Sequence, residues 1–436
     1  MVSSGICRVV AVLGLTALIA LTAIPGGAVA FADGGNPNVV DPRTGGPAVG
    51  GEADLWVYPA GDPTQDKPNV QWAVDNVAVG GTVRLKAQDV DGNPRSFDFG
   101  TEMVIGTFNV EIIRSCTVEG EVLRRKYQEP DDPLYGQRVM TTIQNGAAVF
   151  GVFGAWDSYA DRVEVVVKNL ISRDAAVHVI GTYGFADVEI DNVQIIDLAA
   201  LADYPARIAF FAHSHGNYTV KHCTVGMKPA PFDVELEAGI AYKGFDSPPA
   251  MIGADLEFVH NDIATQYGAG IHIEDNALAD EPKDIQIGHN KVVGPAGIIA
   301  MRLHGASVLV ANRIHATATG IALDSVADST VRRNRIDLAG TSAAGLQLHD
   351  VANSRVWKNQ VAGDTEFGFL IEGSSFGNTF VLGEDDLSAL RVSEAHVYLA
   401  AETHDNLLAL EDGEDLIIVD HGTNNEIHND DDDDDD

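Results

Sequence analysis

A short pattern that recurs along the chain constrains its fold more than any other feature. The stretch GIALDSVADSTVRRNRI covers residues 320–336, and GLQLHDVANSRVWKNQV covers residues 345–361. Both begin with Gly, continue with two apolar residues that flank a variable one, and then carry a polar residue. Both end with Ser-x-Val-x-x-Asn-x-apolar. A pattern that returns at such a spacing indicates that each repeat is one structural unit stacked on the next.

The Asn and the Gly of this pattern mark a period in the twenties. The later gaps between Asn residues are 312 − 290 = 22, 334 − 312 = 22 and 359 − 334 = 25. The Asn position is occupied by Asn169, Asn192, Asn261, Asn290, Asn312, Asn334 and Asn359, with Cys223 in its place in one repeat. The Gly position is occupied by Gly239, Gly270, Gly297, Gly320, Gly345 and Gly368. Short apolar runs lie between these positions and predict several short strands in each repeat.

Short strands at this period predict an all-β solenoid, the single-stranded right-handed parallel β-helix. Leucine-rich repeats have the same period, but their Leu-x-x-Leu-x-Leu scaffold is absent. In a parallel β-helix, successive coils stack at about 4.8 Å and apolar side chains fill the interior. The recurring Asn is predicted to point inward at a bend, where its amide bonds backbone groups of neighbouring coils. We therefore interpret it as structural rather than catalytic.

Composition and charge narrow the classes of partner. The chain has 436 residues, 45% of them hydrophobic, which is enough for one large buried core, and its formal net charge is -36. This charge argues against nucleic acid as a partner, because phosphate binding needs clustered Lys and Arg. It argues equally against anionic membrane surfaces, and it permits binding of Ca²⁺. The chain is expected to be a monomer with no other cofactor.

The two ends of the chain are predicted to lie outside the solenoid. Residues 1–30 have the features of a cleaved signal peptide, with an apolar run that ends in small residues near Ala30, so we expect a secreted, periplasmic or extracellular protein without a membrane anchor. Residues 31–53 are rich in Gly and Pro and predict a flexible leader. Residues 54–429 are predicted to form the β-helix domain. Residues 430–436 are all Asp and predict a disordered tail.

One helix is expected, at residues 68–77. Val70, Ala73, Val74 and Val77 have the spacing of one helical face, and Pro68 fits a first turn. This helix is predicted to cap the first coil and to cover its open edge. The two cysteines that remain after signal cleavage, at 116 and 223, are interpreted as buried free thiols rather than a disulfide.

The helix and the repeats together resemble a known group. The stretch VQWAVDNVAVGGTVRLKA at residues 70–87, followed by the repeats, is similar to the pectate-lyase-like superfamily of secreted β-helix proteins, and the resemblance covers residues 53–429. That superfamily includes polysaccharide lyases, glycoside hydrolases, uronate epimerases and proteins of unknown role. The Asn-Thr-Asp, Asp-Asp and Gly-His-Gly signatures of polygalacturonases are absent from the strand positions. The Trp-Ile-Asp-His and Arg-x-Pro-x-x-Arg signatures of the main pectate lyases are also absent. The resemblance therefore implies the fold and assigns no catalytic residue.

Two columns of outward side chains are predicted when the coils are aligned on the Gly position. The residues four after it are ionisable on seven successive coils: His213, Lys243, Glu274, Arg302, Asp324, His349 and Glu372. Arg302 is placed in this column by its distance from Asn312. The second column begins with three ring side chains that stand two or three residues after the Gly position: Phe211, Tyr242 and His272. Rings of this kind stack on sugars, so the two columns together predict a surface that holds a glycan.

These residue types fit chemistry on a uronic acid polymer. A base must remove the C5 proton, and a cation must neutralise the carboxylate. The catalytic candidates are Lys243, His272, Glu274, Arg302 and Asp324, and the substrate-binding candidates are Phe211, His213, Tyr242 and His349. Hydrolysis would need two carboxylates, for which Glu274 and Asp324 stand two coils apart, near the upper limit for an inverting pair. No residue is assigned as a metal ligand.

Two functions remain open from the sequence. The first is a carbohydrate-active protein, a polysaccharide lyase or uronate epimerase in preference to a hydrolase, which acts on an extracellular glycan laid along the columns. The second is a non-catalytic extracellular binding or surface protein. In that case the alternating charges only stabilise neighbouring strands.

Overall fold

The structure is a computed structural model. It describes residues 36–101, 108–124, 138–146, 148–155, 159–175, 180–196, 206–210, 216–226, 238–244, 255–265, 268–275, 284–303, 307–387, 389–411 and 416–429. The chain separates into two units, residues 1–30 and 31–436, and every described residue belongs to the second. The predicted signal peptide and poly-Asp tail, together with Phe211 and His213, lie outside the described residues. None of the described helices is long and apolar enough to cross a membrane.

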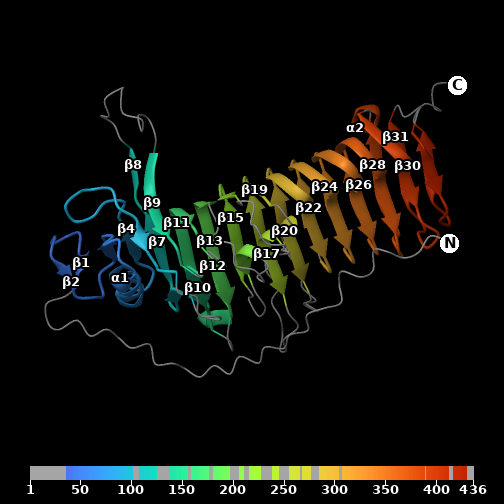
Figure 1. Cartoon of the computed structure of the whole chain (residues 1–436). Coiled ribbons are helices and arrows are strands. Elements are labelled where there is room, and N and C mark those ends of the chain that lie inside the picture. The colour runs from blue at the N-terminus through green and yellow to red at the C-terminus, as the bar shows by residue number, and fades with distance from the viewer. Residues whose placement is uncertain are drawn as a thin grey trace, which may run out of the picture. The chain divides into compact units, whose positions relative to one another are not determined.

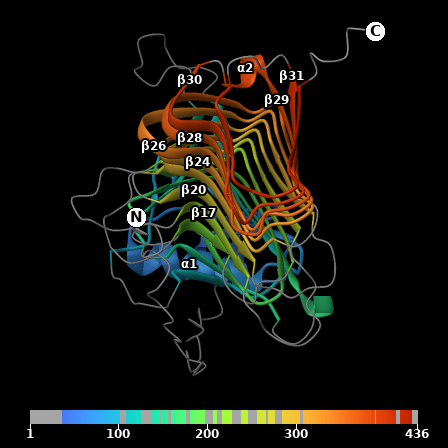
Figure 2. The ribbon, with the colours of Figure 1, turned by 90° about the vertical axis from the view of Figure 1, so that its right-hand side faces the viewer.

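The described strands form a parallel β-helix, which confirms the predicted fold (Figures 1 and 2). The coils contribute to three faces, and every strand except β1, β2 and β8 pairs in parallel with its equivalent one coil away. Face I is formed along most of the length by β13 (Ala186–Ile196), β15 (Asn217–Lys221), β18 (Asp255–Val259), β21 (Ile285–Gly288), β23 (Ser307–Val310), β25 (Thr330–Arg332), β27 (Arg355–Trp357), β29 (Thr379–Gly383), β31 (Leu407–Glu411) and β33 (Glu426–Asn429).

Faces II and III share their longest strands. Face II contains β16 (Thr224–Val225), β19 (Asp262–Ala264) and the first halves of β22 (Lys291–Met301), β24 (Arg313–Asp324), β26 (Arg335–His349) and β28 (Gln360–Glu372). Face III contains the second halves of these four strands, preceded by β10 (Phe150–Phe153), β12 (Ile180–Tyr183), β14 (Ala206–Phe210), β17 (Ala238–Gly244) and β20 (Ala269–Asp275) and followed by β30 (Leu390–Leu399) and β32 (Ile418–Asp420).

The alternation of buried and exposed side chains follows the repeat pattern. In β24, Ile321 and Leu323 are each 1% exposed, whereas the intervening Ala322 and the following Asp324 are partly exposed. One continuous cluster of Val, Ile, Leu and Phe side chains runs through the interior. The apolar residues that flank the variable one are thus the inward residues, as the sequence predicted. Burial of this core is the main stabilising contribution to the coils.

The recurring Asn forms a buried ladder at the bend between face I and face II. Asn261, Asn290, Asn312, Asn334 and Asn359 are each at most 2% exposed. Each of the first four donates from Nδ2 to Oδ1 of the next, over 2.9–3.0 Å. Each also donates to a backbone carbonyl of the coil before it, as Asn334 does to Leu309 O over 3.0 Å. The structural interpretation of the Asn is therefore confirmed for this run.

Two of the predicted ladder positions are wrong. Asn169 and Asn192 have positive φ, 60° and 53°, and stand one residue earlier in the bend, in register with His222 rather than Cys223. Asn adopts this backbone more often than most residues do, which accounts for Asn at these two positions of the bend. A second ladder, which the repeat analysis missed, lies at the turn into face I. It runs through Asn378, Asn406 and Asn425.

The recurring Gly lies where face II bends into face III. A Cβ on Gly320 would stand 2.4 Å from Cγ2 of Ile336 and 2.5 Å from the backbone oxygen of Gly345. The same arrangement repeats at Gly270, Gly297 and Gly345. Glycine is therefore required here because a branched side chain of one coil occupies the space that a Cβ would need.

The N-terminal region differs from the prediction in two respects. The helix α1 spans Pro63–Asn76, so it begins five residues before the predicted Pro68, which lies in its interior. Asp62 is its N-cap and accepts a hydrogen bond from the backbone N–H of Thr64 over 2.9 Å. A proline at the first helical position and an Asp before it are favourable start signals that the prediction overlooked. The helix packs against β1, β3, β4, β5 and β6 at the first coils, and it buries Val70, Ala73 and Val74.

The segment predicted as a flexible leader is partly ordered. Within residues 31–53, β1 (Asn36–Val40) and β2 (Pro47–Ala48) pair antiparallel, and β1 also pairs with β3 (Asp54–Val57). The prediction is wrong for these residues because Val39 and Ala48 are buried in the core. The remaining first strands are β4 (Thr82–Leu85), β5 (Phe97–Asp98), β6 (Val110–Ile112), β7 (Cys116–Gly120), β8 (Val122–Arg124), β9 (Arg138–Gln144) and β11 (Val163–Arg173).

Candidate functional site

Face III carries the column of ionisable residues, with one member displaced. The strand register runs Lys243, Glu274, Met301, Asp324, His349 and Glu372. Arg302 was predicted in this column, but Met301 occupies the position and Arg302 follows it with φ of 55°. The turn from Met301 to Ser307 is one residue longer than the turn from Asp324 to Ser329, which aligns with it. Counting back from Asn312 therefore slipped by one residue.

The predicted ring platform is also wrong. Tyr242 is 1% exposed and lies in register with Phe210 and Ile273, so it points into the core. Its ring centroid is 6.0 Å from that of Tyr218, and burial raises the pKa of its hydroxyl. The outward residue of that coil is Ala241, which pairs with His272. Of the three predicted ring residues, His272 is the only one within the described part of the chain that faces outward. A single ring does not form a stacking platform.

Arg302 still takes part in the surface of face III. Its guanidinium forms an ion pair with the carboxylate of Glu274 on the preceding coil. The Glu274 side chain is 20% exposed and the Arg302 side chain 44%. The pair leaves part of the guanidinium open to solvent, where it can bind a second anion.

His349 stands between two carboxylates. Its Nδ1 is 3.5 Å from Oδ1 of Asp324, one coil before it, and 3.4 Å from Oδ2 of Asp350, the next residue. Asp350 adopts φ of 53° at the end of β26 and accepts a hydrogen bond from the backbone N–H of Ser374 over 2.6 Å. Asp324 accepts a hydrogen bond from the hydroxyl of Ser325 over 2.8 Å. These bonds hold both carboxylates in place beside the imidazole.

Asp350 is the functional candidate that sequence reasoning missed. It lies outside the regular column, and only its place directly after His349 at the strand end pointed to it. Among the described residues, Asp324, His349 and Asp350 form the only group of at least three side chains whose ligand atoms could hold a metal ion, within 4.8 Å of one another. Two carboxylates and an imidazole suit a divalent cation such as Ca²⁺ or Zn²⁺ only in part, since Ca²⁺ prefers six to eight oxygen ligands.

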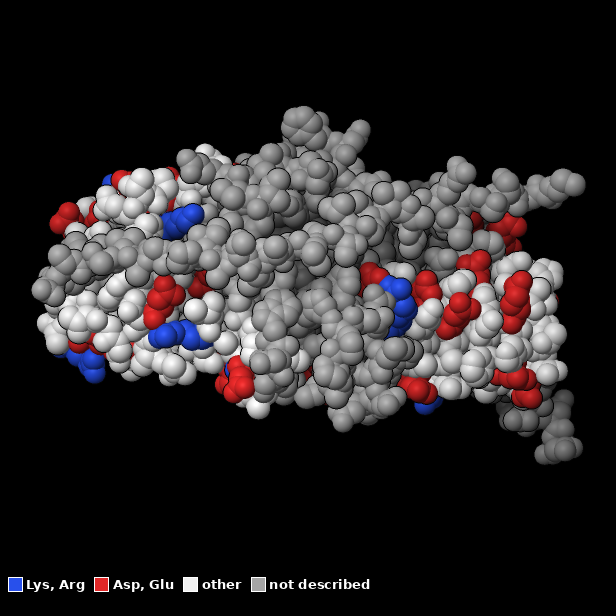
Figure 3. Space-filling view, turned by 90° about the horizontal axis from the view of Figure 1, so that it is seen from below, with Lys and Arg blue, Asp and Glu red and all other residues white. Residues whose placement is uncertain are grey.

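The remaining members of the column are accounted for as follows. Glu372 accepts a hydrogen bond from Nε2 of Gln347 over 3.1 Å, which ties two adjacent coils together. Lys243 lies in register with Glu274, and the structure describes its backbone position only. Glu274 and Asp324 are two coils apart, as predicted. In the view from below, several acidic side chains and few basic ones appear over the C-terminal coils (Figure 3).

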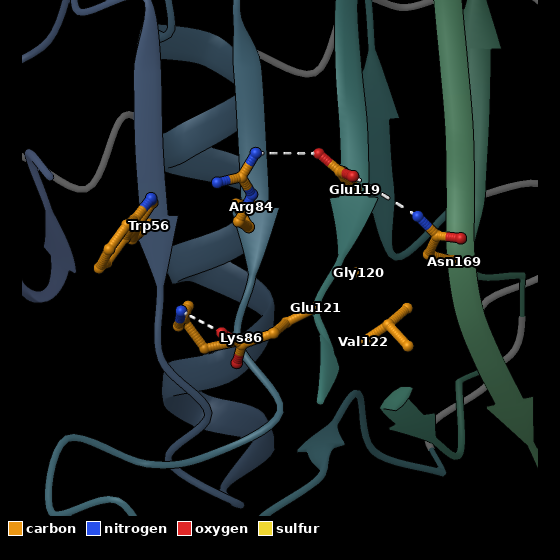
Figure 4. A pocket seen from close by; sticks show the side chains of 8 residues that line it. All are labelled: Trp56, Arg84, Lys86, Glu119, Gly120, Glu121, Val122 and Asn169. Carbon is orange, nitrogen blue, oxygen red and sulfur yellow. Dashed lines mark hydrogen bonds and ion pairs between the residues drawn. The ribbon is translucent and has the colours of Figure 1, made fainter. Parts of the chain in front are cut away.

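A separate pocket of about 440 Å³ opens on the N-terminal end of face I (Figure 4). Its ring side chain is Trp56, and Nζ of Lys86 stands 4.2 Å from that ring's centroid. Lys86 forms an ion pair with Glu121, and Arg84 pairs with Glu119 over 3.1 Å. The four charges thus compensate one another within the protein, so the pocket needs no ligand to balance them. The sequence analysis did not anticipate it.

The comparison with protein families supports the fold. The family model "Right handed beta helix region" matches residues 215–384. No curated protein matches the chain. The mannuronan C-5 epimerase A-module of Azotobacter vinelandii is similar in structure, with a TM-score of 0.31 and 12% identity over 83% of this chain and 91% of that one. The GH136 lacto-N-biosidase of Eubacterium ramulus gives a TM-score of 0.29 and 11% identity over 80% of this chain and 62% of that one.

Similarity at these identities does not extend to activity. The family match and the parallel coils agree with each other and with the repeat pattern of the sequence. This protein is a right-handed parallel β-helix.

Proposed function

We propose that this protein is carbohydrate-active and performs acid–base chemistry on an acidic glycan that lies along face III. The observation that carries this proposal is the position of His349 between Asp324 and Asp350. Among the described residues, no side chain bonds the other ring nitrogen of His349, and the imidazole is 47% exposed. A histidine held on one side by carboxylates and open on the other has the arrangement of a general base.

The chemistry that suits this arrangement is removal of a proton next to a carboxylate. In a lyase reaction, Nε2 of His349 would take the C5 proton of a uronate, the bond between C4 and the glycosidic oxygen would break, and a C4–C5 double bond would remain. The departing oxygen would take up a proton from water. In an epimerase reaction, C5 would instead regain a proton from water on its opposite side. Asp324 and Asp350 would stabilise the imidazolium that forms in either case.

Arg302 is assigned to the substrate carboxylate. It belongs to the coil of Met301, two coils from His349, which is about 10 Å by strand spacing. An arginine side chain can span part of this distance, and a linear glycan would present a neighbouring sugar unit there. Glu274 orients the guanidinium through their ion pair. The other catalytic candidates, Lys243 and His272, flank this surface on the N-terminal side.

A non-catalytic function is favoured by a different observation. Side chains of face III are bonded across adjacent coils, as in the ion pair of Glu274 with Arg302 and the hydrogen bond between Gln347 and Glu372. Pairs of this kind stabilise neighbouring strands by about 0.2–1 kcal/mol each, whatever the protein binds. On this reading the protein is an extracellular binding or surface protein.

The deciding experiment is a set of polysaccharides incubated with the protein and assayed for three products. Ultraviolet absorbance detects the unsaturated product of a lyase, proton NMR detects inversion at C5, and a reducing-end assay detects hydrolysis. Alginate and polygalacturonate represent acidic chains, and a neutral glucan is the comparison. We expect a lyase or epimerase product from an acidic chain, and a loss of about 10²- to 10⁴-fold in rate for His349→Ala.

His315→Ala is the matched control, because His315 is an exposed histidine on face II of the coil that carries Asp324. It should retain the parent's rate. If no polysaccharide gives a product, or if both histidine variants behave alike, the acid–base proposal fails and the non-catalytic function stands.

The place of action is part of the same proposal. Residues 1–30 predict export, and the charge of -36 suits a soluble protein in a salty exterior. Expression with the native N-terminus should release a protein into the medium or periplasm whose N-terminal sequencing begins near Phe31. A protein retained in the cytoplasm with Met1 intact would contradict export.

A further inference from the structure

A second surface stands out where face I bends into face II, along the outer side of the Asn ladder. The bend has two residues, and it separates β23 from β24, β25 from β26 and β27 from β28. We call this surface the basic corner and define it by Lys291, Arg313, Arg333, Arg335, Arg355 and Lys358. Each coil has three bends, and two of them border face III. The bend between face I and face II does not. The basic corner is therefore distinct from the site proposed above.

The basic corner concentrates positive charge in a strongly negative protein. Its six residues are drawn from only 28 Lys and Arg in a chain of net charge -36. All six side chains are exposed. The strand register places Lys291, Arg313 and Arg335 next to one another on three successive coils. Successive coils are about 4.8 Å apart, so the cations form a line along the helix axis.

Few acidic groups balance this charge. Lys291 pairs with Asp262 over 3.4 Å, and Arg335 pairs with Asp337 over 3.4 Å, both at exposed positions. Within the described part of the chain, no carboxylate lies within ion-pair distance of the side chains of Arg313, Arg333, Arg355 and Lys358. Like charges held this close repel one another, and a bound anion would relieve that repulsion.

A tryptophan at the centre of the basic corner is surrounded by cations. Trp357 has the guanidinium of Arg355 at 4.9 Å from its ring, that of Arg332 at 5.5 Å and Nζ of Lys358 at 5.9 Å. Cation–π contacts hold these groups in place. Nε1 of Trp357 and Nε of Arg332 are buried, and neither has a hydrogen-bond partner among the described residues.

Towards the N-terminus the same bend carries three stacked histidines. The ring centroids of His222 and His260 are 5.6 Å apart and those of His260 and His289 are 4.9 Å apart, with 12° between the planes in each case. Their faces are therefore turned towards one another, and their N–H edges are what a ligand can reach. Single-stranded nucleic acid binds through open aromatic faces, which neither this stack nor the flanked Trp357 offers.

We propose that the basic corner binds a linear acidic polysaccharide, one that carries carboxylate or sulfate groups along its length. Guanidinium groups pair with such oxyanions in two parallel hydrogen bonds. The line of cations matches a polymer lying along the helix axis, with one anionic group for each coil or every second coil. The exposed edges of the stacked histidines supply further hydrogen bonds. The basic corner anchors the polysaccharide and performs no reaction.

The test is calorimetric titration of the purified protein with heparin, polygalacturonate, neutral dextran and poly-dT, at low and moderate salt. The variant is Arg333→Ala with Lys358→Ala. Alanine is compatible with the backbone there, because Ala311 occupies the same position on the preceding coil with φ of 54°, and Arg333 and Lys358 have 55° and 54°. The control is Arg43→Ala with Arg95→Ala, which removes the same charge from exposed side chains far along the chain.

We expect the parent to bind both acidic polysaccharides and not dextran, with an affinity that falls as salt rises. The Arg333/Lys358 variant should bind about tenfold more weakly, and the control pair should match the parent. Failure at face III is seen as loss of product in the polysaccharide assay, whereas failure at the corner is seen as loss of binding in the calorimetric titration, so the two are told apart. The proposal is overturned if no acidic polysaccharide binds, if the control pair loses as much affinity, or if poly-dT binds more tightly than the polysaccharides.

Discussion

Replacement of Asn334 by alanine should remove one rung of the buried ladder and destabilise the protein far more than loss of an exposed amide. Asn334 makes four hydrogen bonds through its side chain. Its Oδ1 accepts from the backbone N–H of Asn312 over 3.0 Å and from the Nδ2 of Asn312 over 2.9 Å. Its Nδ2 donates to Leu309 O over 3.0 Å and to Asn359 Oδ1 over 2.9 Å.

The magnitude follows from the groups that lose their partner. The backbone N–H of Asn312, one N–H of its amide and the carbonyl of Leu309 would be left without this partner at a site where Asn334 is 1% exposed. Each unsatisfied buried polar group costs about 1–3 kcal/mol. Asn359 Oδ1 keeps the bond that it accepts from the backbone N–H of Asn334. We therefore expect a loss of about 3 kcal/mol or more in the free energy of unfolding.

A urea titration followed by circular dichroism measures this loss. The matched control is Gln360→Ala, an exposed amide on the neighbouring coil that lies in register with Arg335. It should change the free energy of unfolding by no more than about 0.5 kcal/mol. If both variants lose the same stability, the ladder does not hold the coils together as described, and the repeated Asn needs another explanation.

Three further predictions concern the packing of the coils. Gly320→Ala should lower the unfolding temperature and cost about 1–3 kcal/mol, because the new Cβ would collide with the side chain of Ile336. Gly46→Ala is the control and should be near neutral, because the nearest atom to its Cβ would be 3.7 Å away. Burial raises the thiol pKa values of Cys116 and Cys223 to about 12. Neither thiol should therefore react with a thiol reagent at mildly alkaline pH until the protein is unfolded. Rapid labelling of the native protein would refute their burial. Asp66→Ala should cost about 3 kcal/mol in a thermal melt, since its carboxylate accepts from the N–H groups of Ala60, Asp62 and Asp98. Burial raises the pKa of Asp66, so the contribution of Asp66 to the free energy of unfolding declines as the pH rises through its folded pKa. The difference in stability between parent and variant should therefore shrink from acid to neutral pH. A difference that grows would contradict this reasoning.

The sequence was sufficient for the fold and for the inward residues of the later coils. There the period stays close to 22 residues, and a Gly, two apolar residues and an Asn return in the same order. Once one residue is assigned as inward or outward, its equivalents on the other coils are assigned as well. The α1 boundary was missed because helical periodicity was given more weight than the Asp62 and Pro63 start signals. The bend positions of Asn169 and Asn192 could not be told from ladder positions, because the two differ by a single residue.

The candidate site was harder to predict than the fold for the same reason. A shift of one residue moves a strand side chain from the outer to the inner surface. Tyr242 was placed outside by such a shift, and Arg302 was placed in the column because the turn before β23 holds one extra residue. Asp350 could not be identified from the repeat, because its proximity to Asp324 depends on the turn that follows β26.

The Asn ladder also makes the protein a rod whose length can change only by whole coils. Removal of residues 313–334, which are 22 residues by the spacing of Asn312 and Asn334, would join Asn312 directly to Arg335. Asn312 would then occupy the place of Asn334 and donate to Asn359, so the hydrogen-bonded series would close without a gap. A deletion that does not remove whole coils would bring a residue other than Asn to the ladder. The distance along the axis between any two surfaces can therefore change only in steps of about 4.8 Å. Proteins of this kind could change the distance between two binding sites by gaining or losing coils.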